Sequence, residues 1–515
     1  MAITPSAIST GSPEATAAGQ RIAELGGNAV DIAVSAALTA TVSEICFCSL
    51  GGSAYLMLHT PGHSAEVIDG GDAMPSVPPA DQRDPNGWFT AKIPYGDGIE
   101  IQGGHAAVGV PGALASLELA WERHGTLPWS ELVQPALELS RRQYPAGKTM
   151  AKWLSVSAVP LFSPQPASRA CFLPDGLHPV KEGDLFQIPE MSGTLELIAA
   201  EGAAAFYQGE LGRLFSEELI SHGGFVTRED LASYRAEIRR PILLKSGGFK
   251  LALNPSPAVG GLALAALVRA AENHPWPRDS SQNQIDLMAR AQGWLVGLRE
   301  GNRLSTEFDP KFAVELLNRD DFADAHTSLK SPSTTHISVA TADGALVSIT
   351  LSMGYGSGIT IPGTGIACNN SLGEPELNPR GYFAIPRGER MLSNMAPTVA
   401  WHPDGRTLAI GSPGANRITS AIANTWLHHA LNGLSYSDAV EAPRLHVERI
   451  RDEVRVQYEP GLEPPQLDRR WKLSPFTEKH MYFGAVKLAG RNAIGQMEAV
   501  TDSRRHGAAV VTHPG

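Results

Sequence analysis

The spacing of apolar and polar positions changes near residue 334. Before that point apolar residues recur mainly at helical spacing. After it, apolar and β-branched residues alternate in the segments 337–341 and 346–351, which an Asp-Gly turn joins into an expected hairpin. The pattern therefore predicts an α/β (α+β) protein with strands at its centre and helices outside, helix-rich before residue 334 and strand-rich after it.

Several element boundaries can be assigned from the residues at their ends. Ser12, Pro13 and Glu14 form a helix start, with a hydroxyl at the N-cap, proline in the first turn and an acid beside it. Asn28 should cap a helix from Ala29 to about Thr41, and Thr227 with Asp230 resembles a capping box. Further helices are expected at 113–123, 131–142, 191–201, 209–222, 282–300 and 419–431, strands at 54–59, 249–253, 398–401, 408–410 and 508–511, and a loop at 69–104.

Composition narrows the class of protein. The 515 residues are 43% hydrophobic and 18% charged with a net charge of -11, and no low-complexity linker divides them, so one large domain or two closely packed ones are expected. The chain has no basic tract of the kind that binds nucleic acid, and no apolar run is long enough to cross a membrane. Without a visible signal sequence, a cytoplasmic location is expected. The four cysteines should be free thiols, and no Cys or His cluster has zinc spacing, so we expect no metal and no cofactor in the chemistry.

The junction Ser333-Thr334-Thr335-His336 is the candidate reactive site. A threonine hydroxyl needs an adjacent base, and the α-amino group of Thr334 would serve if the chain were cut between Ser333 and Thr334. By themselves these residues favour a plain Ser/Thr-rich loop entering a strand. The segment 411–417, between an expected strand and an expected helix, could supply an oxyanion hole. His336 would share a face with Thr334, as a base or, more consistently with its position in a strand, as a structural hydrogen-bonding group.

Several longer motifs occur in order along almost the whole chain. They are Gly26-Gly27-Asn28-Ala29-Val30-Asp31, Gly109-Val110-Pro111-Gly112, Gly125-Thr126-Leu127-Pro128, Thr334-Thr335-His336, Pro362-Gly363-Thr364-Gly365-Ile366, Asn369-Asn370, Met395-Ala396-Pro397-Thr398, Gly411-Ser412-Pro413-Gly414 with Arg417-Ile418, and Asp502-Ser503-Arg504-Arg505. With these motifs the chain resembles the γ-glutamyltransferase family of N-terminal nucleophile hydrolases.

The resemblance implies a four-layer αββα sandwich made as a proenzyme that cleaves itself. A large fragment, 1–333, and a small one, 334–515, would associate as one intertwined domain. Thr334 would be the nucleophile and its freed amine the base, with Gly414 and Ala415 as the oxyanion hole. Thr350 would support the nucleophile if the preceding hairpin is two residues shorter than in the family.

The acyl-binding residues depart from the family's pattern. The family's D-G-R-E-x-x-P stretch, whose arginine binds a carboxylate, reads Asp69-Gly70-Gly71-Asp72-Ala73-Met74-Pro75, so Gly71 replaces the arginine. The paired serines appear as Ser393-Asn394, the amino-group asparagine as Ser352, and a following glutamine as Ser371, while Glu374 would be the remaining amino-group acid. These changes indicate an altered acyl group, unless an arginine from elsewhere, such as Arg390, restores the contact.

The predicted function is a self-processing amidohydrolase or acyltransferase that forms an acyl-enzyme and passes the acyl group to water or an amine acceptor. Its partner would be a small-molecule amide: a γ-glutamyl donor such as glutathione, or a small amide, an N-acyl amine or a β-lactam side-chain amide. The alternative from another class is an unprocessed, non-catalytic scaffold that keeps the fold.

Overall fold

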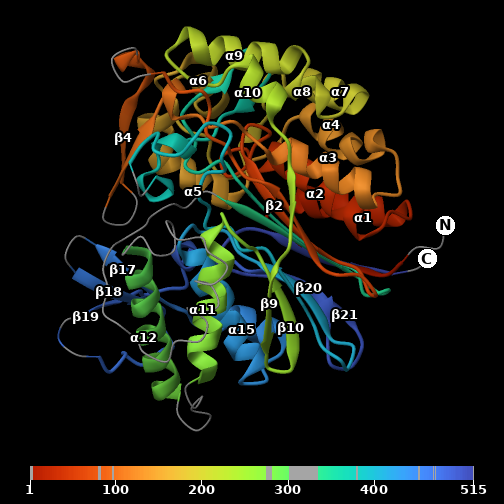
Figure 1. The fold of residues 1–515 in the computed structure, drawn as a ribbon, viewed down its shortest axis with the longest axis vertical. Coiled ribbons are helices and arrows are strands. Elements are labelled where there is room, and N and C mark those ends of the chain that lie inside the picture. Colours follow the sequence, from red (N-terminus) through yellow and green to blue (C-terminus); the bar gives the residue numbers. More distant parts are fainter. Residues whose placement is uncertain are drawn as a thin grey trace.

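Two antiparallel β-sheets stacked face to face form the centre of the molecule (Figure 1). The computed structural model describes residues 4–78, 83–94, 98–273, 281–300, 334–378, 381–450, 453–467, 469 and 471–513. The first sheet has the order β22 (Ala508–Thr512), β1 (Ser6–Thr10), β11 (Thr335–Thr341), β12 (Leu346–Ser352), β2 (Ser53–His59), β3 (Glu66–Gly70) and β8 (Glu237–Arg239). The second has the order β21 (Met497–Thr501), β20 (Lys487–Arg491), β16 (Thr407–Gly411), β15 (Thr398–Trp401), β10 (Phe249–Leu253) and β9 (Ile242–Ser246).

Helices cover the outer face of each sheet, which completes four layers in the order αββα (Figure 1). The layer on the first sheet contains α1 (Pro13–Glu24), α2 (Ala29–Ser43), α3 (Ala113–His124) and α4 (Trp129–Ser140). The layer on the second contains α11 (Val259–Asn273), α12 (Ser281–Glu300) and α15 (Arg417–Ala430). This is the predicted arrangement of central strands and outer helices.

Smaller elements extend these layers. The remaining α-helices are α5 (Lys148–Ser157), α6 (Pro166–Phe172), α7 (Met191–Glu201), α8 (Ala204–Tyr207), α9 (Glu210–Ser221), α10 (Arg228–Ser233) and α16 (Tyr436–Glu441). The short helical turns are η2 (Pro85–Gly87), η3 (His105–Ala107), η4 (Ala158–Phe162), η5 (Ser371–Gly373), η6 (Pro375–Leu377) and η7 (Met481–Phe483). The other strands are β4 (Phe89–Ile93), β5 (Ile99–Gly103), β6 (Tyr144–Pro145), β7 (Leu185–Phe186), β13 (Thr360–Ile361), β14 (Ile366–Ala367), β17 (Leu445–Ile450), β18 (Glu453–Tyr458) and β19 (Trp471–Pro475).

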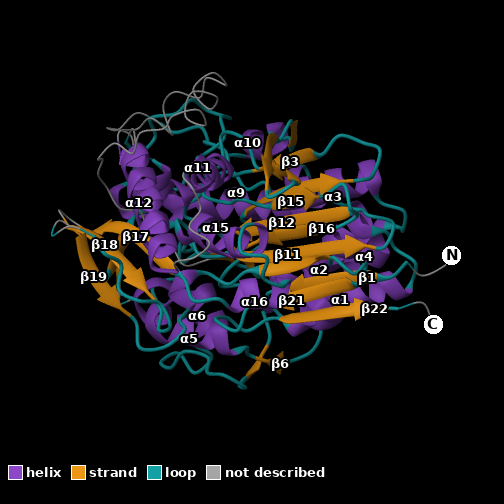
Figure 2. Ribbon diagram, turned by 90° about the horizontal axis from the view of Figure 1, so that it is seen from below, coloured by secondary structure: helices purple, strands orange, loops and turns teal. Residues whose placement is uncertain are grey.

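Strand β11 lies in the interior of the first sheet. It pairs with β1 on one side and β12 on the other, and all seven of its residues are buried (Figure 2). The second sheet packs on its inner face, while α2, which has no polar face and is buried along its whole length, packs on the outer side. The residue before this strand, Thr334, is therefore held by a rigid support on both faces.

Strands from both sides of residue 334 contribute to both sheets. In the first sheet β1, β2, β3 and β8 precede it, and β11, β12 and β22 follow it; in the second, β9 and β10 precede it. Figure 2 shows β22, β1, β11 and β12 side by side in this order, although β1 and β22 come from opposite ends of the chain. The two predicted fragments would thus share one core.

The structure corrects two sequence-based expectations. The segment 69–104, predicted as a loop, contains the hairpin of β4 and β5. Its glycines and prolines favoured a loop in the prediction, although the residues of the two strands alternate. Several strands of the central sheets were not predicted, among them β1, β3, β9, β20 and β21. Strand β1, for example, pairs with β11 and β22, which lie hundreds of residues away. The other predicted helices and strands are present within a few residues of their expected ends.

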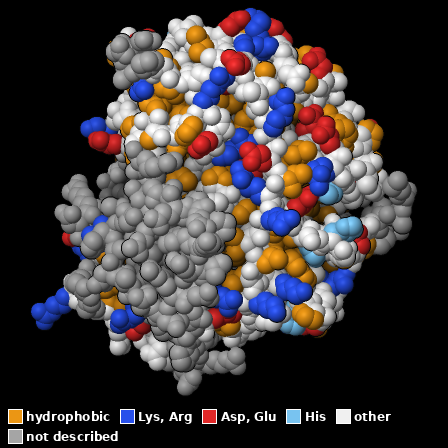
Figure 3. All heavy atoms as spheres, viewed as in Figure 1, with side chains coloured by type: hydrophobic (Ala, Val, Ile, Leu, Met, Phe, Trp, Pro, Cys, Tyr) orange, Lys and Arg blue, Asp and Glu red, His pale blue; other side chains and the backbone are white. Residues whose placement is uncertain are grey.

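The charged side chains and the cysteines are arranged as the composition predicts. On the face in Figure 3, acidic and basic side chains are interspersed over the upper helical layer. Cys46, Cys48, Cys171 and Cys368 are all buried free thiols, as predicted. Among the described residues, no helix has the length and apolar character needed to cross a membrane.

Candidate active site

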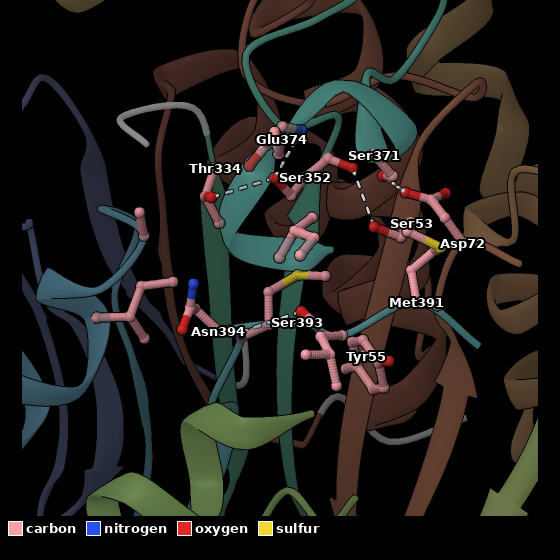
Figure 4. A pocket seen from close by; sticks show the side chains of 17 residues that line it. Ser53, Tyr55, Asp72, Thr334, Ser352, Ser371, Glu374, Met391, Ser393 and Asn394 are labelled. Carbon is pink, nitrogen blue, oxygen red and sulfur yellow. Dashed lines mark hydrogen bonds between the residues drawn. The ribbon is translucent and has the colours of Figure 1, made fainter. Parts of the chain in front are cut away.

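Thr334 lies at the entrance to β11, with only 4% of its surface exposed. Its hydroxyl donates to Ser352 Oγ at 3.2 Å, and Ser352 Oγ accepts a second hydrogen bond from Gly354 N at 3.0 Å (Figure 4). Arg505 Nη1 donates to the carbonyl oxygen of Thr334 at 3.2 Å. Both the side chain and the backbone of the proposed nucleophile are therefore held in place, the backbone by an arginine of the last predicted motif.

Strand register explains why Ser352 meets Thr334. Thr335 is paired with Leu351, and His336 with Thr350, so the next pair outward is Thr334 with Ser352. The two-residue shortening that assigned the support role to Thr350 is not needed in this register. The contact recorded for Thr350 Oγ1 is with His336 Nδ1, at 2.8 Å. The structure thus favours Ser352 as the hydroxyl that supports Thr334, with Thr350 one pair further along the strands.

His336 is a structural residue in this arrangement. Its ring contacts the hydroxyls of Thr350, Ser338 and Ser348, and burial lowers the pKa of the imidazole to about 3. A side chain at Gly411 would lie 2.1 Å from this ring, so glycine is required there for the two sheets to close over His336. A permanently neutral, fully hydrogen-bonded histidine agrees with the structural alternative and disfavours a role as catalytic base.

The segment between β16 and α15 supplies candidate oxyanion donors. Gly414 and Ala415 have φ values of 125° and 55°, which turn the chain into α15. An alanine in the left-handed region is uncommon and indicates a backbone held by its surroundings. Ala415 lines the same pocket as Thr334. Within the described part of the chain, the N–H groups of Gly414 and Ala415 donate to no acceptor, so both are available to an oxyanion.

The pocket beside Thr334 collects most of the predicted site residues (Figure 4). Predicted residues that line it are Gly71, Thr334, Ser352, Glu374, Ser393, Asn394 and Ala415. Other lining residues are Ser53, Tyr55, Asp72, Gly354, Ser371, Leu377, Met391, Leu392, Met395 and Ile418. Thr350 and Gly414 are not among the lining residues, and Ser333 lies outside the described residues. The described lining residues include two carboxyl groups and no lysine, arginine or histidine.

The two carboxyl groups are buried and hard to ionise. Burial raises the pKa of Asp72 to about 7, although hydrogen bonds from Ser371 and Ser53 oppose the rise. Burial, reinforced by the nearby Glu376, raises the pKa of Glu374 well above its usual range, and one of its oxygens accepts from Tyr355 N at 3.1 Å. A cation bound between them would favour their ionised forms.

Gly71, at the position of the family's arginine, faces a tyrosine. A side chain at Gly71 would start 2.4 Å from Tyr55 Oη and 3.0 Å from Asp69 Oδ1, so no side chain fits without displacing Tyr55. Tyr55 Oη is buried and has no hydrogen-bond partner among the described residues, and the same is true of Asn394 Oδ1. The pocket thus offers unpaired oxygen atoms in place of a guanidinium group.

Arg390 does not replace the missing arginine. Its guanidinium lies 4.3 Å from the ring centre of Tyr234, 3.6 Å from Asp69 Oδ1, and donates to the carbonyl oxygen of Arg235. Its side chain is only 6% exposed and does not line the pocket. The pocket lining therefore gives no support for Arg390 as the partner of a substrate carboxylate.

Three contributors escaped the sequence analysis. Asp72 stood within the motif that drew attention to Gly71, but its own carboxyl was overlooked. Tyr55 lies in a predicted strand, but the sequence did not indicate that its side chain would point to the pocket. Arg505 was quoted in the last motif without a role, and its contact with Thr334 depends on a pairing across 171 positions of sequence.

Comparison with known proteins supports the class of enzyme that the fold and the site indicate. A four-layer αββα fold with a threonine at the entrance of a central strand defines an N-terminal nucleophile hydrolase. The model of the gamma-glutamyltranspeptidase family matches residues 15–512, so the chain belongs to this family. It is a hydrolase or acyltransferase of the N-terminal nucleophile type.

Among similar proteins are two proenzymes and one solved structure. The glutathione hydrolase proenzyme of Bacillus subtilis is 27% identical over 98% of this chain and 91% of its own. The acylase ACY 1 proenzyme of a Pseudomonas species is 30% identical over 86% of this chain and 82% of its own. The cephalosporin acylase of Bacillus halodurans superposes with a TM-score of 0.80 at 24% identity, covering 99% of this chain and 96% of that one, which shows the shared fold.

Proposed function

We propose that this enzyme cleaves itself before Thr334, uses Thr334 as its nucleophile, and takes acyl groups that carry an amine and no carboxylate. The observation that carries the substrate class is the charge of the pocket beside Thr334. Its described lining residues include the carboxyl groups of Asp72 and Glu374 and no basic side chain.

Self-cleavage creates the catalytic base. In the uncut chain the hydroxyl of Thr334 attacks the carbonyl carbon of Ser333, the C–N bond breaks, and the amide nitrogen takes up a proton. Water then hydrolyses the resulting ester and leaves Thr334 with a free α-amino group. Fragments 1–333 and 334–515 remain associated through the shared sheets.

Turnover repeats the same chemistry on a substrate. The free amine accepts the hydroxyl proton as Thr334 Oγ1 bonds to the substrate carbonyl carbon, and the N–H groups of Gly414 and Ala415 stabilise the oxyanion. The proton passes to the leaving nitrogen as its bond to carbon breaks, which gives an ester of Thr334. Water or an amine then attacks the ester and releases the acyl group. Ser352 and Arg505 hold Thr334 in position throughout.

The pocket favours an ammonium group over a carboxylate. A substrate carboxylate would lie beside Asp72 and Glu374, and no basic side chain lines the pocket to pair with it, which is unfavourable in a poorly solvated site. An ammonium group would pair with these carboxyls and donate to the unpaired oxygens of Tyr55 or Asn394. Charge-assisted hydrogen bonds of this kind contribute on the order of 1.5–3 kcal/mol each.

A second candidate function is hydrolysis of γ-glutamyl compounds. Its support is the likeness to the glutathione hydrolase proenzyme of Bacillus subtilis, while the acylase ACY 1 proenzyme, which has a slightly higher identity over a smaller share of the chain, carries a different name. A γ-glutamyl group has both an amine and a carboxylate on the same carbon, so it tests both features of the pocket.

Four 4-nitroanilides separate these possibilities. Butanoyl has neither charged group, 4-aminobutanoyl has the amine, glutaryl has the carboxylate, and γ-glutamyl has both. We expect kcat/KM to be highest for 4-aminobutanoyl, by about tenfold or more over butanoyl, and lowest for glutaryl. A γ-glutamyl anilide that is cleaved fastest would refute the substrate class. Failure of the purified chain to separate into two fragments, or to cleave any of the four, would support the scaffold alternative.

A further inference from the structure

A cluster of two histidines and one glutamate lies outside the active site. His105 begins η3, Glu218 lies in α9, and His222 is the residue that ends this helix. One potential ligand atom from each of the three lies within 4.8 Å of the other two. The imidazole rings are stacked, with their centres 4.7 Å apart.

The spacing of these atoms suits a small divalent ion. His105 Nε2 is 3.2 Å from Glu218 Oε1, and His222 Nδ1 is 3.7 Å from the same oxygen. In a tetrahedral site with metal–ligand bonds of about 2.0–2.2 Å, neighbouring ligand atoms are roughly 3.3–3.6 Å apart. Imidazole nitrogen and carboxylate oxygen are ligands that zinc and similar transition ions accept together. Rotation of the two rings out of their stacked arrangement would bring the three groups around one ion.

Hydrogen bonds hold Glu218 in place, and those of His222 would be exchanged for a bond to the ion. His222 Nδ1 lies 2.9 Å from the carbonyl oxygen of Glu218 and 3.1 Å from Ser221 Oγ. Glu218 has a further side-chain hydrogen bond with Gln165, and the hydrogen bond from His105 is the largest cause of its lowered pKa. The contact of Gln165 with Glu218 is of the kind that orients a metal ligand, whereas His222 Nδ1 would give up its proton and its contact with the carbonyl oxygen on binding the ion. The side chains of His105 and Glu218 are 13% and 17% exposed and that of His222 is 55% exposed, so an ion could enter from solvent.

We propose that His105, Glu218 and His222 form a binding site for a divalent transition-metal ion, with zinc as the best match and water completing its coordination. The ion would join α9 to η3. The turn η3 and the residues after it pack against the segment 369–374. Gly109 N donates to Asn369 Oδ1 at 2.9 Å, and a side chain at Gly373 would lie 3.1 Å from Ala107. Glu374 is the next residue. The site would thus stabilise the support of the acyl pocket without taking part in the reaction.

Cobalt binding tests the site independently of activity. The protein would be an untagged Thr334→Ala chain, which has no freed threonine amine to bind metal, dialysed against a chelator. We expect Co²⁺ to bind at one equivalent with visible d–d absorption bands, Zn²⁺ to displace it, and Zn²⁺ to raise the melting temperature by on the order of a few degrees.

Single substitutions assign the ligands. His222→Gln, at the most exposed ligand, should weaken Co²⁺ binding at least tenfold and abolish the Zn²⁺-dependent rise in melting temperature, as should Glu218→Gln and His105→Gln. His178→Gln is the matched control, since His178 pairs with Asp175 at the surface, 2.7 Å away. The proposal is overturned if Co²⁺ gives no bands at one equivalent, or if His222→Gln and His178→Gln bind it as the parent does.

Discussion

The nucleophile and the acyl-binding wall of the same pocket are built in different ways. Thr334 sits at the entrance to a strand that is paired on both sides and covered by a helix layer and a second sheet. The acyl-binding wall comes largely from loops and short turns, including those that carry Asp72, Glu374 and Asn394. The reaction therefore depends on the rigid centre of the fold, whereas the choice of acyl group depends on connections that can change without altering that centre.

Electrostatics separates the two regions as well. Around the nucleophile the recorded partners are hydroxyls, backbone groups and Arg505. The acyl-binding wall concentrates carboxyl groups with raised pKa values and oxygen atoms without partners. Thr334 and Arg505 belong to the family's motifs, whereas the wall departs from them at Gly71, Ser371 and Asn394. The four experiments below test whether the two regions can be changed separately.

Thr334→Ala should have the largest effect. It removes the hydroxyl for both self-cleavage and turnover, so the chain should remain a single band on a denaturing gel, and activity should fall by at least about a thousandfold. Thr334→Ser is the matched control and should still be cut. N-terminal sequencing of the smaller wild-type fragment should begin at Thr334; a different first residue, or cleavage of the alanine variant, would contradict the assignment.

Glu374→Gln should affect specificity and leave the reaction intact. Loss of the carboxylate should lower kcat/KM for the 4-aminobutanoyl anilide by about 10–100-fold, because a charge-assisted contact becomes a neutral one, while the rate on the butanoyl anilide changes little. Glu182→Gln, at an exposed position outside the pocket lining, is the control. Equal losses on both anilides in Glu374→Gln would show that Glu374 acts on the reaction itself.

The preference for an amine should depend on pH. Because the pKa of Asp72 is raised to about 7, this carboxyl is mostly neutral below that pH and ionised above it. An ammonium binds the ionised form better, so the ratio of kcat/KM for 4-aminobutanoyl over butanoyl should rise by roughly tenfold between pH 5.5 and 8. The ratio cancels titration of the Thr334 amine, which affects both substrates. A flat ratio would exclude Asp72 from amine binding.

Gly71→Arg combined with Tyr55→Ala should have the smallest effect. Removing the tyrosine ring opens the space that a side chain at Gly71 needs, and the guanidinium supplies the missing partner for a carboxylate. We expect kcat/KM for the glutaryl anilide to rise by up to about tenfold, since the nearby Asp69 competes for the new charge. Tyr55→Ala alone should produce no such rise. Similar gains in both variants would mean that space, and not charge, limits glutaryl substrates.

Much of this protein follows from its sequence alone. Hydrophobic periodicity and capping residues such as Ser12 and Asn28 predict most of the longer helices and several strands of the two central sheets, because those signals act over a few neighbouring residues. The ordered motifs predict the four-layer fold, the family and Thr334 as nucleophile. Gly71 shows that the usual carboxylate contact is missing.

Only the tertiary structure decided which side chains line the pocket in place of the missing arginine. Strand register, a long-range property, placed Ser352 opposite Thr334, where motif comparison had suggested Thr350. Packing put Tyr55 against Gly71 and directed Arg390 to Asp69, away from the pocket. Burial raised the pKa values of the carboxyl groups of Asp72 and Glu374. Each outcome depends on which residues, distant in the sequence, pack next to one another, and no local sequence pattern predicts this.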